Sequence, residues 1–348
     1  LPEQKDIHAV LVATPDHHHA FAAVEAMRAG KHVFCQKPLA HSVHEVRVMM
    51  ETAARHKVVT QMGTQVHASD HFRRVVEIVQ GGVLGHVRRV QVWCEKRPDA
   101  MFRAKESQPP KTLNYDLWLG PAPARSYPPY RLGGKGTHGI HQDWRWWWDF
   151  GGGILADMAC HYMDLPHWAL SLRHPTTVAA QGRVTYQGDN NMPDLLQVDY
   201  EYPARGDRPP VHLTWYHGMP GPDLAGKVRH AGYASGVLME GAKGSLIADF
   251  DKHQLLPEER FRGFQPPPRT IAASVGQYRE WLQAIRDGGQ TTCNFDYSGA
   301  LTETVLLGNV AYRAGGGKLQ YDAVTGRVSG NDNAEQYLRR EYRRGWTL

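Results

Sequence analysis

The chain has 348 residues, of which 41% are hydrophobic and 22% charged, and its formal net charge is +5. This length allows two domains or one large one, and the composition is typical of an ordinary globular protein. No apolar run approaches the ~18 residues of a membrane span, and no basic face or nucleic-acid-binding module is apparent. We therefore expect neither a membrane nor a nucleic acid as a partner.

The first ninety residues alternate between short apolar runs and helical patterns. The apolar runs at 9–14, 31–35 and 57–63 are typical of parallel strands covered on both faces. Helical patterns follow each of them, at 17–30, 42–55 and 69–82, and Ser42 with Glu45 forms a capping box for the second. This alternation predicts right-handed βαβ units in a partial Rossmann-type doubly wound parallel sheet.

Near residue 87 the pattern changes from alternating strands and helices to consecutive strands. After a half-exposed strand, a loop-rich stretch at about 98–145 and one helix at 155–170, strands follow one another without intervening helices. Two late helices complete this part. The pattern predicts an α+β domain with a large, mainly antiparallel sheet. We expect the domains to be 1–86 and 87–330, followed by a C-terminal tail at 331–348.

Cysteine and histidine patterns indicate no metal and no disulfide framework. The four cysteines lie far apart without a C-x-x-C pair, which favours reduced thiols. The neighbouring residues His17, His18 and His19 point in different directions and have no partner at ligand spacing, so we expect no metal site. The first ten residues lack the features of a signal peptide, and we expect a cytoplasmic protein. A periplasmic location is the alternative if a leader precedes Leu1.

One glycine motif has the letters of a dinucleotide fingerprint but the wrong context. The segment GKGTHG, at 134–139, matches G-x-G-x-x-G. That motif needs a buried strand before it and a helix after it, whereas prolines and further glycines precede this segment. We interpret it as a flexible loop rather than a phosphate site.

Three stretches together resemble one enzyme family. The segments VATPDHHHA, AGKHVFCQKPLA and GGGILADMACHYMD occur in an order and spacing similar to the Gfo/Idh/MocA family of NAD(P)-dependent oxidoreductases. The resemblance runs from about Ile7 to about Arg313 and implies NAD or NADP as cofactor and a sugar, inositol or glycoside as substrate. It also implies that the first strands of the Rossmann domain, with its glycine fingerprint, would lie upstream of Leu1.

Lys37 is the first candidate site residue. It follows a predicted parallel strand, and open α/β sheets bind ligands at the carboxyl ends of their strands. The alternative is a lysine that snorkels from a strand end to solvent. The resemblance implies that Lys37 contacts the nicotinamide ribose and the reacting hydroxyl, and it places six further residues beside the cofactor. These are Thr14, Pro15, His17, His19, Gln36 and Pro38; most family members carry Glu at the position of Gln36.

Asp157 and His161 stand four residues apart on a predicted helix, which places both on one face. Such a pair is often only structural. The resemblance implies instead that His161 is the general base and that Asp157 accepts a hydrogen bond from a substrate hydroxyl. Histidine suits proton transfer near neutral pH. Asp164 falls on nearly the same stripe of the helix and is a further substrate candidate.

The segment QDWRWWWDF is the most aromatic in the chain. Clustered tryptophans usually lie in a core or a domain interface. Sugar rings also stack on indoles, so we expect substrate contacts from Arg145 and one of the four tryptophans, with Trp144 as the first choice. Tyr115 and His138 are weaker candidates.

Three functions remain open from the sequence. The leading one is an oxidoreductase that moves a hydride between a carbohydrate or polyol hydroxyl and a nicotinamide cofactor. The second is an NAD-dependent glycosidase on the same scaffold, which oxidises a hydroxyl transiently and eliminates the aglycone. The third is a non-catalytic, ligand-binding relative. For each we expect a homodimer or homotetramer formed through the C-terminal sheet.

Overall fold

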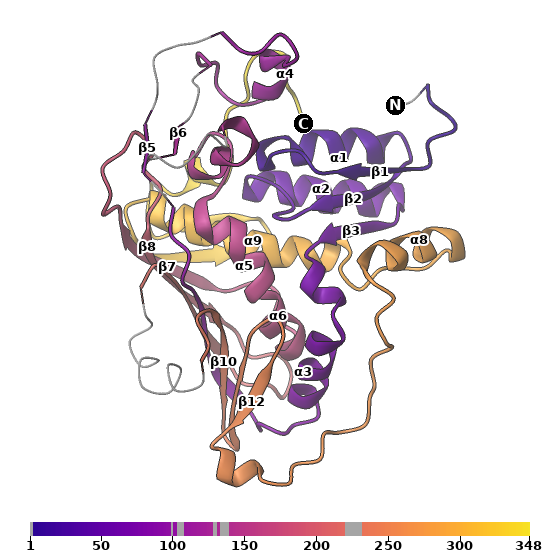
Figure 1. Cartoon of the computed structure of the whole chain (residues 1–348), viewed down its shortest axis with the longest axis vertical. Helices are drawn as coiled ribbons and strands as arrows, with labels where there is room; N and C mark the ends of the chain where they lie inside the picture. The colour runs from indigo at the N-terminus through magenta and orange to yellow at the C-terminus, as the bar shows by residue number, and fades with distance from the viewer. Residues whose placement is uncertain (1–2, 99, 103–107, 128–130, 133–138, 220–231) are drawn as a thin grey trace.

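The computed structural model describes residues 3–98, 100–102, 108–127, 131–132, 139–219 and 232–348. Three sheets occur in these ranges: a parallel sheet of three strands, a mixed sheet of nine strands, and a short pair formed by β5 (Met101–Phe102) and β6 (Arg131–Leu132). Figure 1 shows the small sheet with its helices at the N-terminal part of the chain and the large sheet below it.

The N-terminal sheet contains β1 (Ala9–Val12), β2 (His32–Gln36) and β3 (Thr60–Gly63) in that order. Both neighbouring pairs are parallel. The strands are connected by α1 (Asp16–Arg28) and α2 (Val43–His56), which lie beside the sheet in Figure 1. The predicted βαβ order and parallel sheet are therefore confirmed.

The predicted capping box at the start of α2 is also confirmed. Ser42 Oγ accepts a hydrogen bond from the Glu45 amide at 3.3 Å, and the Glu45 carboxylate accepts one from the Ser42 amide at 3.2 Å. The same carboxylate accepts a hydrogen bond from Arg340 of the C-terminal tail at 2.7 Å. Phe21 of α1 packs edge-on against Tyr342. The C-terminal tail therefore contacts both α1 and α2.

The connection between the two sheets is formed by a 3-10 helix, η1 (Gln65–Ala68), and by α3 (Asp70–Gln80). Helix α3 packs against α6 (Asp164–Leu170), close to the large sheet, as Figure 1 shows. The domain boundary at residue 86 stays a prediction, but α3 packs with a helix of the second part of the chain.

The large sheet has the strand order β12-β11-β10-β4-β9-β8-β7-β13-β14. All neighbouring pairs are antiparallel except β4 and β9, so the prediction of a mainly antiparallel sheet is confirmed. The strands are β4 (Val87–Cys94), β7 (Thr177–Arg183), β8 (Leu195–Tyr202), β9 (Val211–His217), β10 (Gly236–Gly241), β11 (Gly244–Ala248), β12 (His253–Leu256), β13 (Gly317–Asp322) and β14 (Arg327–Ser329).

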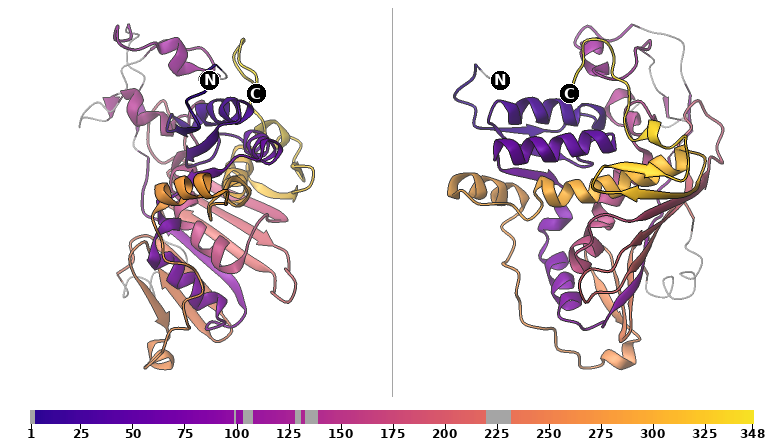
Figure 2. Two further views of the ribbon diagram at one scale, coloured as in Figure 1. Left: turned by 90° about the vertical axis from the view of Figure 1, so that its right-hand side faces the viewer. Right: turned by 180° about the vertical axis from the view of Figure 1, so that it is seen from behind.

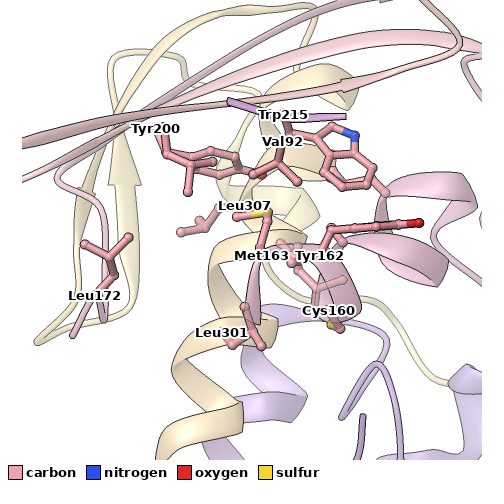
Figure 3. Close-up of a cluster of buried hydrophobic side chains, with 14 of the residues drawn as sticks. Val92, Cys160, Tyr162, Met163, Leu172, Tyr200, Trp215, Leu301 and Leu307 are labelled. Atoms are coloured by element: carbon pink, nitrogen blue, oxygen red, sulfur yellow. The ribbon is translucent and has the colours of Figure 1, made fainter. Parts of the chain in front are cut away.

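The core lies between this sheet and a layer of helices. Figure 2 shows the helices on one side of the sheet, and Figure 3 shows Trp215 and Tyr200 of the sheet facing Met163 and Leu307 of the helices. Trp215 and Tyr200 are fully buried, and burying such a side chain contributes roughly 1.5–3 kcal/mol. The layer contains α5 (Gly153–Tyr162), α6 and α9 (Phe295–Arg313). The remaining helices are α4 (Tyr115–Leu119), α8 (Gln277–Asp287), η2 (Gly139–His141), η3 (Asp143–Trp146), η4 (Glu258–Phe261) and η5 (Glu335–Tyr337).

The single helix predicted at 155–170 is wrong, because two helices, α5 and α6, meet at Met163. Pro166 lies in the first turn of α6. A proline in a helix interior lacks an amide donor and its ring clashes with the carbonyl four residues earlier, so the chain starts a new helix instead. The four cysteines are free and buried, which agrees with the prediction of reduced thiols. In the parts of the chain that the structure describes, none of the helices is both long and apolar enough to cross a membrane.

Candidate active site

A cavity of about 810 Å³ lies where the carboxyl edge of the parallel sheet meets the helices of the large sheet. Its volume is within the range of small-molecule sites, ≈ 300–1,000 Å³. Lys37 reaches it from the end of β2 and Gln65 from η1, while helix α5 contributes further side chains. The lining residues used below are Lys37, Gln65, Lys96, Arg145, Trp146, Asp157 and His161.

Lys37 and Asp157 form an ion pair in the wall of this cavity. Lys37 Nζ donates hydrogen bonds to Asp157 Oδ1 at 2.8 Å and to the Asp157 carbonyl at 2.5 Å. The two side chains are only 15% and 16% exposed. Lys37 therefore does not snorkel into bulk solvent. Its side chain extends from the end of β2 to α5, where its hydrogen bonds to Asp157 fix its position.

Arg145 binds the same carboxylate. Its Nε donates to Asp157 Oδ1 at 3.1 Å, so two cations share one anion. Burial alone would raise the pKa of Asp157, but the Lys37 ammonium and the Arg145 guanidinium outweigh burial and lower that pKa below its usual value. Asp157 is therefore ionised at neutral pH and holds both cations at the cavity wall.

His161 lies one turn further along α5 and is 6% exposed. Its Nδ1 lies 2.9 Å from the hydroxyl of Thr64, the residue that follows β3. Burial, together with the nearby Lys37 ammonium, lowers the pKa of His161 to about 3. The imidazole is therefore neutral at neutral pH, and it is available to accept a proton but not to donate one from an imidazolium.

His19 and His17 hold backbone segments rather than line the cavity. His19 Nδ1 lies 2.8 Å from the Pro38 carbonyl and its Nε2 lies 2.8 Å from the Thr14 carbonyl. The ring thus connects the exits of β1 and β2. His17 is fully buried, and its Nε2 lies 3.0 Å from the carbonyl of Trp118.

Three predicted cofactor residues lie at the strand exits themselves. Thr14 is exposed at the end of β1, and Pro15 follows it, half-buried. Gln36 is the last residue of β2, and its side chain lies against Gly63 of β3, where a Cβ would approach Gln36 Oε1 to 2.6 Å. These positions lie at the sheet edge where ligands bind in open α/β folds.

Arg145 is positioned by the glycines before α5. A Cβ on Gly151 would come within 2.8 Å of the Arg145 Cα, so only glycine allows the two backbones to lie this close. The guanidinium carbon lies 4.3 Å from the centre of the Trp144 ring, a cation–π contact. Trp144 is 6% exposed and lies behind Arg145, whereas Trp146 lines the cavity. The structure therefore favours Trp146 over Trp144 as the aromatic contact for a substrate.

The remaining candidates are not brought to the cavity. Asp164 is fully buried and accepts hydrogen bonds from His67 Nδ1 at 2.9 Å and from the Tyr297 hydroxyl at 2.7 Å. Tyr115 stacks on Trp118 at the start of α4. We therefore propose neither Asp164 nor Tyr115 as a substrate ligand. His138 and most of the GKGTHG segment lie outside the described residues.

The structure also reveals site residues that the sequence reasoning missed. Gln65 lines the cavity and Thr64 contacts His161, and both directly follow the third apolar strand. The rule that ligands gather at the carboxyl ends of parallel strands could have found them. Lys96, which follows β4, carried no such signal. Asp16, at the start of α1, is buried, and burial raises its pKa to about 8 despite Lys37 and Arg145 nearby.

Comparisons with known proteins agree with this architecture. Residues 1–64 match a family described as "Oxidoreductase family, NAD-binding Rossmann fold", and residues 71–207 match "Oxidoreductase family, C-terminal alpha/beta domain". The inositol 2-dehydrogenase of Rhizobium meliloti is 31% identical over 294 residues, which cover 82% of this chain and 72% of that protein. Several other curated relatives match over shorter segments, and the chain spans 36%, 24% and 22% of the length of three of them.

Solved structures show the same fold at low sequence identity. The WlbA dehydrogenase from Chromobacterium violaceum, in complex with NADH and UDP-GlcNAcA, is 18% identical with a TM-score of 0.61, covering 92% of this chain and 80% of that one. An inositol dehydrogenase homologue from Azotobacter vinelandii, complexed with NADH and myo-inositol, is 15% identical with a TM-score of 0.56, again covering 92% and 80%. At such identities the likeness concerns the fold alone.

Proposed function

Because the chain belongs to the Gfo/Idh/MocA family of NAD-binding oxidoreductases, we propose that it transfers a hydride between a hydroxyl of a sugar, polyol or glycoside and NAD or NADP. One observation carries the proposal. The paired Lys37 and Asp157 and the neutral His161 line one cavity at the carboxyl edge of a parallel sheet.

The residues at this edge suit the nicotinamide end of a dinucleotide. Lys37 and Gln65 come from consecutive strand exits of the sheet, and Lys96 and Arg145 add further positive charge to the cavity wall. An anionic cofactor and a hydroxylated substrate suit this lining, and the volume of about 810 Å³ has room for a nicotinamide end beside a sugar ring. Thr14, Pro15 and Pro38 would contact the cofactor, and Lys37 would lie next to its ribose.

The chemistry follows from the charges and protonation states. The bound nicotinamide supplies the hydride acceptor. Lys37 donates a hydrogen bond to the reacting hydroxyl and stabilises negative charge on its oxygen, while Asp157 holds the ammonium in place. His161 accepts the hydroxyl proton as the C–H hydride leaves, so that the alcohol becomes a carbonyl.

A carbohydrate or polyol substrate is supported by the polar cavity wall and by the relatives. Inositol 2-dehydrogenase and levoglucosan dehydrogenase are among the curated proteins to which the chain is similar. In this chain Arg145 can offer guanidinium hydrogen bonds to hydroxyls, and Trp146 can pack against the C–H face of a sugar ring.

Replacing Arg145 by Leu should mainly weaken substrate binding. We expect KM for the carbohydrate to rise by roughly tenfold and kcat to fall by less than about fivefold, since hydrogen bonds to non-reacting hydroxyls act equally in ground and transition states. Steady-state kinetics measure both constants. Arg286→Leu, at an exposed position on α8, is the control. An unchanged KM would contradict the substrate role.

Cofactor binding and redox stoichiometry test the proposed function itself. Calorimetric titration of the purified protein with NAD and with NADP should give micromolar binding for one of them. A panel of polyols, sugars and glycosides should then yield reduced cofactor in amounts equal to the carbonyl product. Aglycone release without net reduction would identify the glycosidase alternative, and the absence of cofactor binding would favour the ligand-binding alternative.

Assembly and compartment remain proposals. Helices cover one face of the large sheet, and on the other face Trp93, Tyr216 and Leu238 pack with Tyr233 of the same chain. We propose that this face joins copies of the chain into a homodimer or homotetramer, which light scattering of the purified protein tests. The free, buried cysteines support a reducing compartment, the cytoplasm.

A further inference from the structure

Thr64 has no role in the proposed chemistry, yet it contacts the proposed base. It follows β3 directly and is fully buried. Its hydroxyl oxygen lies 2.9 Å from His161 Nδ1 and 3.2 Å from the Cys160 carbonyl, both on α5. Thr64 thus contacts two consecutive residues of α5, and the second of them is the proposed base.

The single hydroxyl hydrogen determines how these contacts work. A carbonyl oxygen can only accept, so the contact with Cys160 requires the Thr64 hydroxyl to donate. The hydroxyl can then only accept from His161, which requires a hydrogen on Nδ1. The reverse arrangement, with the hydroxyl donating to Nδ1, would form one of the two bonds and leave the other contact without a hydrogen. Because unmade hydrogen bonds are costly in a buried site, the two-bond arrangement is favoured.

We propose that Thr64 is a positioning residue that fixes His161 as the Nδ1–H tautomer, so that Nε2 presents its lone pair to the cavity. The Nδ1 edge of the ring is buried against Thr64, and the ring lines the cavity, so Nε2 is the nitrogen that a substrate hydroxyl can reach. The proposal rests on the proposed function for its consequence in catalysis, but the tautomer is a property of the protein alone.

The same contact joins the exit of the parallel sheet to the helix layer of the large sheet. Thr64 belongs to the exit of the parallel sheet and His161 to the helix layer of the large sheet. Phe250, after β11, approaches the His161 ring edge-on with centroids 6.2 Å apart. The ring therefore has a hydrogen bond at one edge and apolar packing beside it, which fixes both its orientation and its tautomer.

The direct test is ¹⁵N NMR of histidine side chains in the free protein. The chain has 20 histidines, so the His161 signals are assigned as those that disappear in His161→Gln. At neutral pH the wild type should show a protonated Nδ1 and an unprotonated Nε2. In Thr64→Val, which keeps the shape but removes the hydroxyl, the Nε2–H form should become dominant, and Thr64→Ser should restore the Nδ1–H form.

Kinetics provide the second measurement. Thr64→Val should lower kcat by roughly 10- to 100-fold with KM changed little, because part of the general-base contribution is lost. Thr64→Ser should recover most of kcat. Thr52→Val on α2 is the matched control, since the Thr52 hydroxyl donates to the Val48 carbonyl far from the site. Its loss costs a similar hydrogen bond without touching His161.

The outcomes separate this inference from the proposed function. A wild-type His161 with Nε2 protonated, or a Thr64→Val protein with an unchanged tautomer, would overturn the role of Thr64 whether or not the protein is a dehydrogenase. A correct tautomer in a protein that reduces no cofactor would leave the role of Thr64 intact and refute the proposed reaction.

Discussion

Replacing Lys37 by Met is expected to lower kcat/KM by about 10²- to 10³-fold. The substitution removes the ammonium that donates to the reacting oxygen, and stabilisation of developing charge by one such donor is worth about 10²–10³ in rate. Loss of the ammonium also removes one cause of the lowered pKa of His161, so the imidazole becomes a stronger base, which offsets a small part of the loss. Cofactor-dependent kinetics on the purified variant measure the loss.

The fold should survive this change. Removing one member of a buried pair usually leaves an uncompensated charge, but Asp157 keeps Arg145 as a partner at 3.1 Å. The control is Lys31→Met: Lys31 precedes β2 and Lys37 follows it, so the two lysines lie at opposite ends of one strand. Lys31→Met should retain full activity. A Lys37→Met protein that melts like the wild type and keeps more than about a tenth of its activity would contradict the role of Lys37.

The second large effect is a steep loss of stability in mild acid. Five histidines at most 6% exposed are held neutral by burial. Burial lowers the pKa of His161 to about 3, the pKa values of His19, His167 and His217 to about 4, and the pKa of His17 well below its usual value. In the unfolded chain a histidine titrates near 6.5, so below that pH the unfolded state binds more protons than the folded one.

Proton binding to these histidines in the unfolded chain therefore destabilises the fold as the pH falls. The contribution of each histidine is complete above pH 6.5 and is lost as the pH falls toward 4, by up to about 1.4 kcal/mol per pH unit. Asp16 acts in the opposite direction, because burial raises its pKa to about 8 and its protonated form favours folding as the pH falls. We expect a net loss of roughly 4 kcal/mol between pH 7 and pH 5.5, a large share of a typical stability of about 5–15 kcal/mol.

Urea unfolding at several pH values measures this loss. His217→Gln should reduce the pH dependence of the free energy of unfolding by the contribution of one histidine. His217 is almost fully buried between Trp215 and the Pro193 carbonyl. His56→Gln, at the exposed end of α2, should leave the slope unchanged. A free energy of unfolding that stays flat from pH 7 to pH 5.5 would show that these histidines are already protonated or accessible in the folded protein.

Much of the fold could be predicted because local patterns and packing agree. The runs at 9–14, 31–35 and 57–63 are mainly apolar and alternate with helical patterns, which predicts parallel strands in βαβ units. The expectation that both faces are covered is wrong for β1, where Leu11 is 48% exposed. The break at Met163 could also have been inferred from Pro166. Strands β12 to β14 were missed because they lie at the two ends of the sheet, where partial exposure weakens the apolar signal.

The site could be predicted less completely, for physical reasons. The resemblance to the family singled out Lys37, Asp157 and His161, whose strand and helix positions alone left a structural role open, and all three line the cavity. The sequence analysis favoured Trp144, whereas Trp146 lines the cavity. Which of them does so depends on the face that the short 3-10 helix η3 presents to the cavity, and four residues are too few for a periodic pattern to predict that face. Asp164 shares a stripe with Asp157 on an ideal continuous helix, but the helix break turns it toward His67.

Transfer of a labelled hydride from substrate to cofactor provides a direct test of the proposed reaction. The protein is mixed with its oxidised cofactor and a panel of polyols and sugars deuterated at carbon, myo-inositol among them, and the cofactor is analysed by mass spectrometry. We predict that a panel member that is turned over to a carbonyl product leaves one deuterium on the accumulated reduced nicotinamide, and that Lys37→Met abolishes the signal. Turnover of a deuterated substrate with no deuterium in the cofactor would contradict the account.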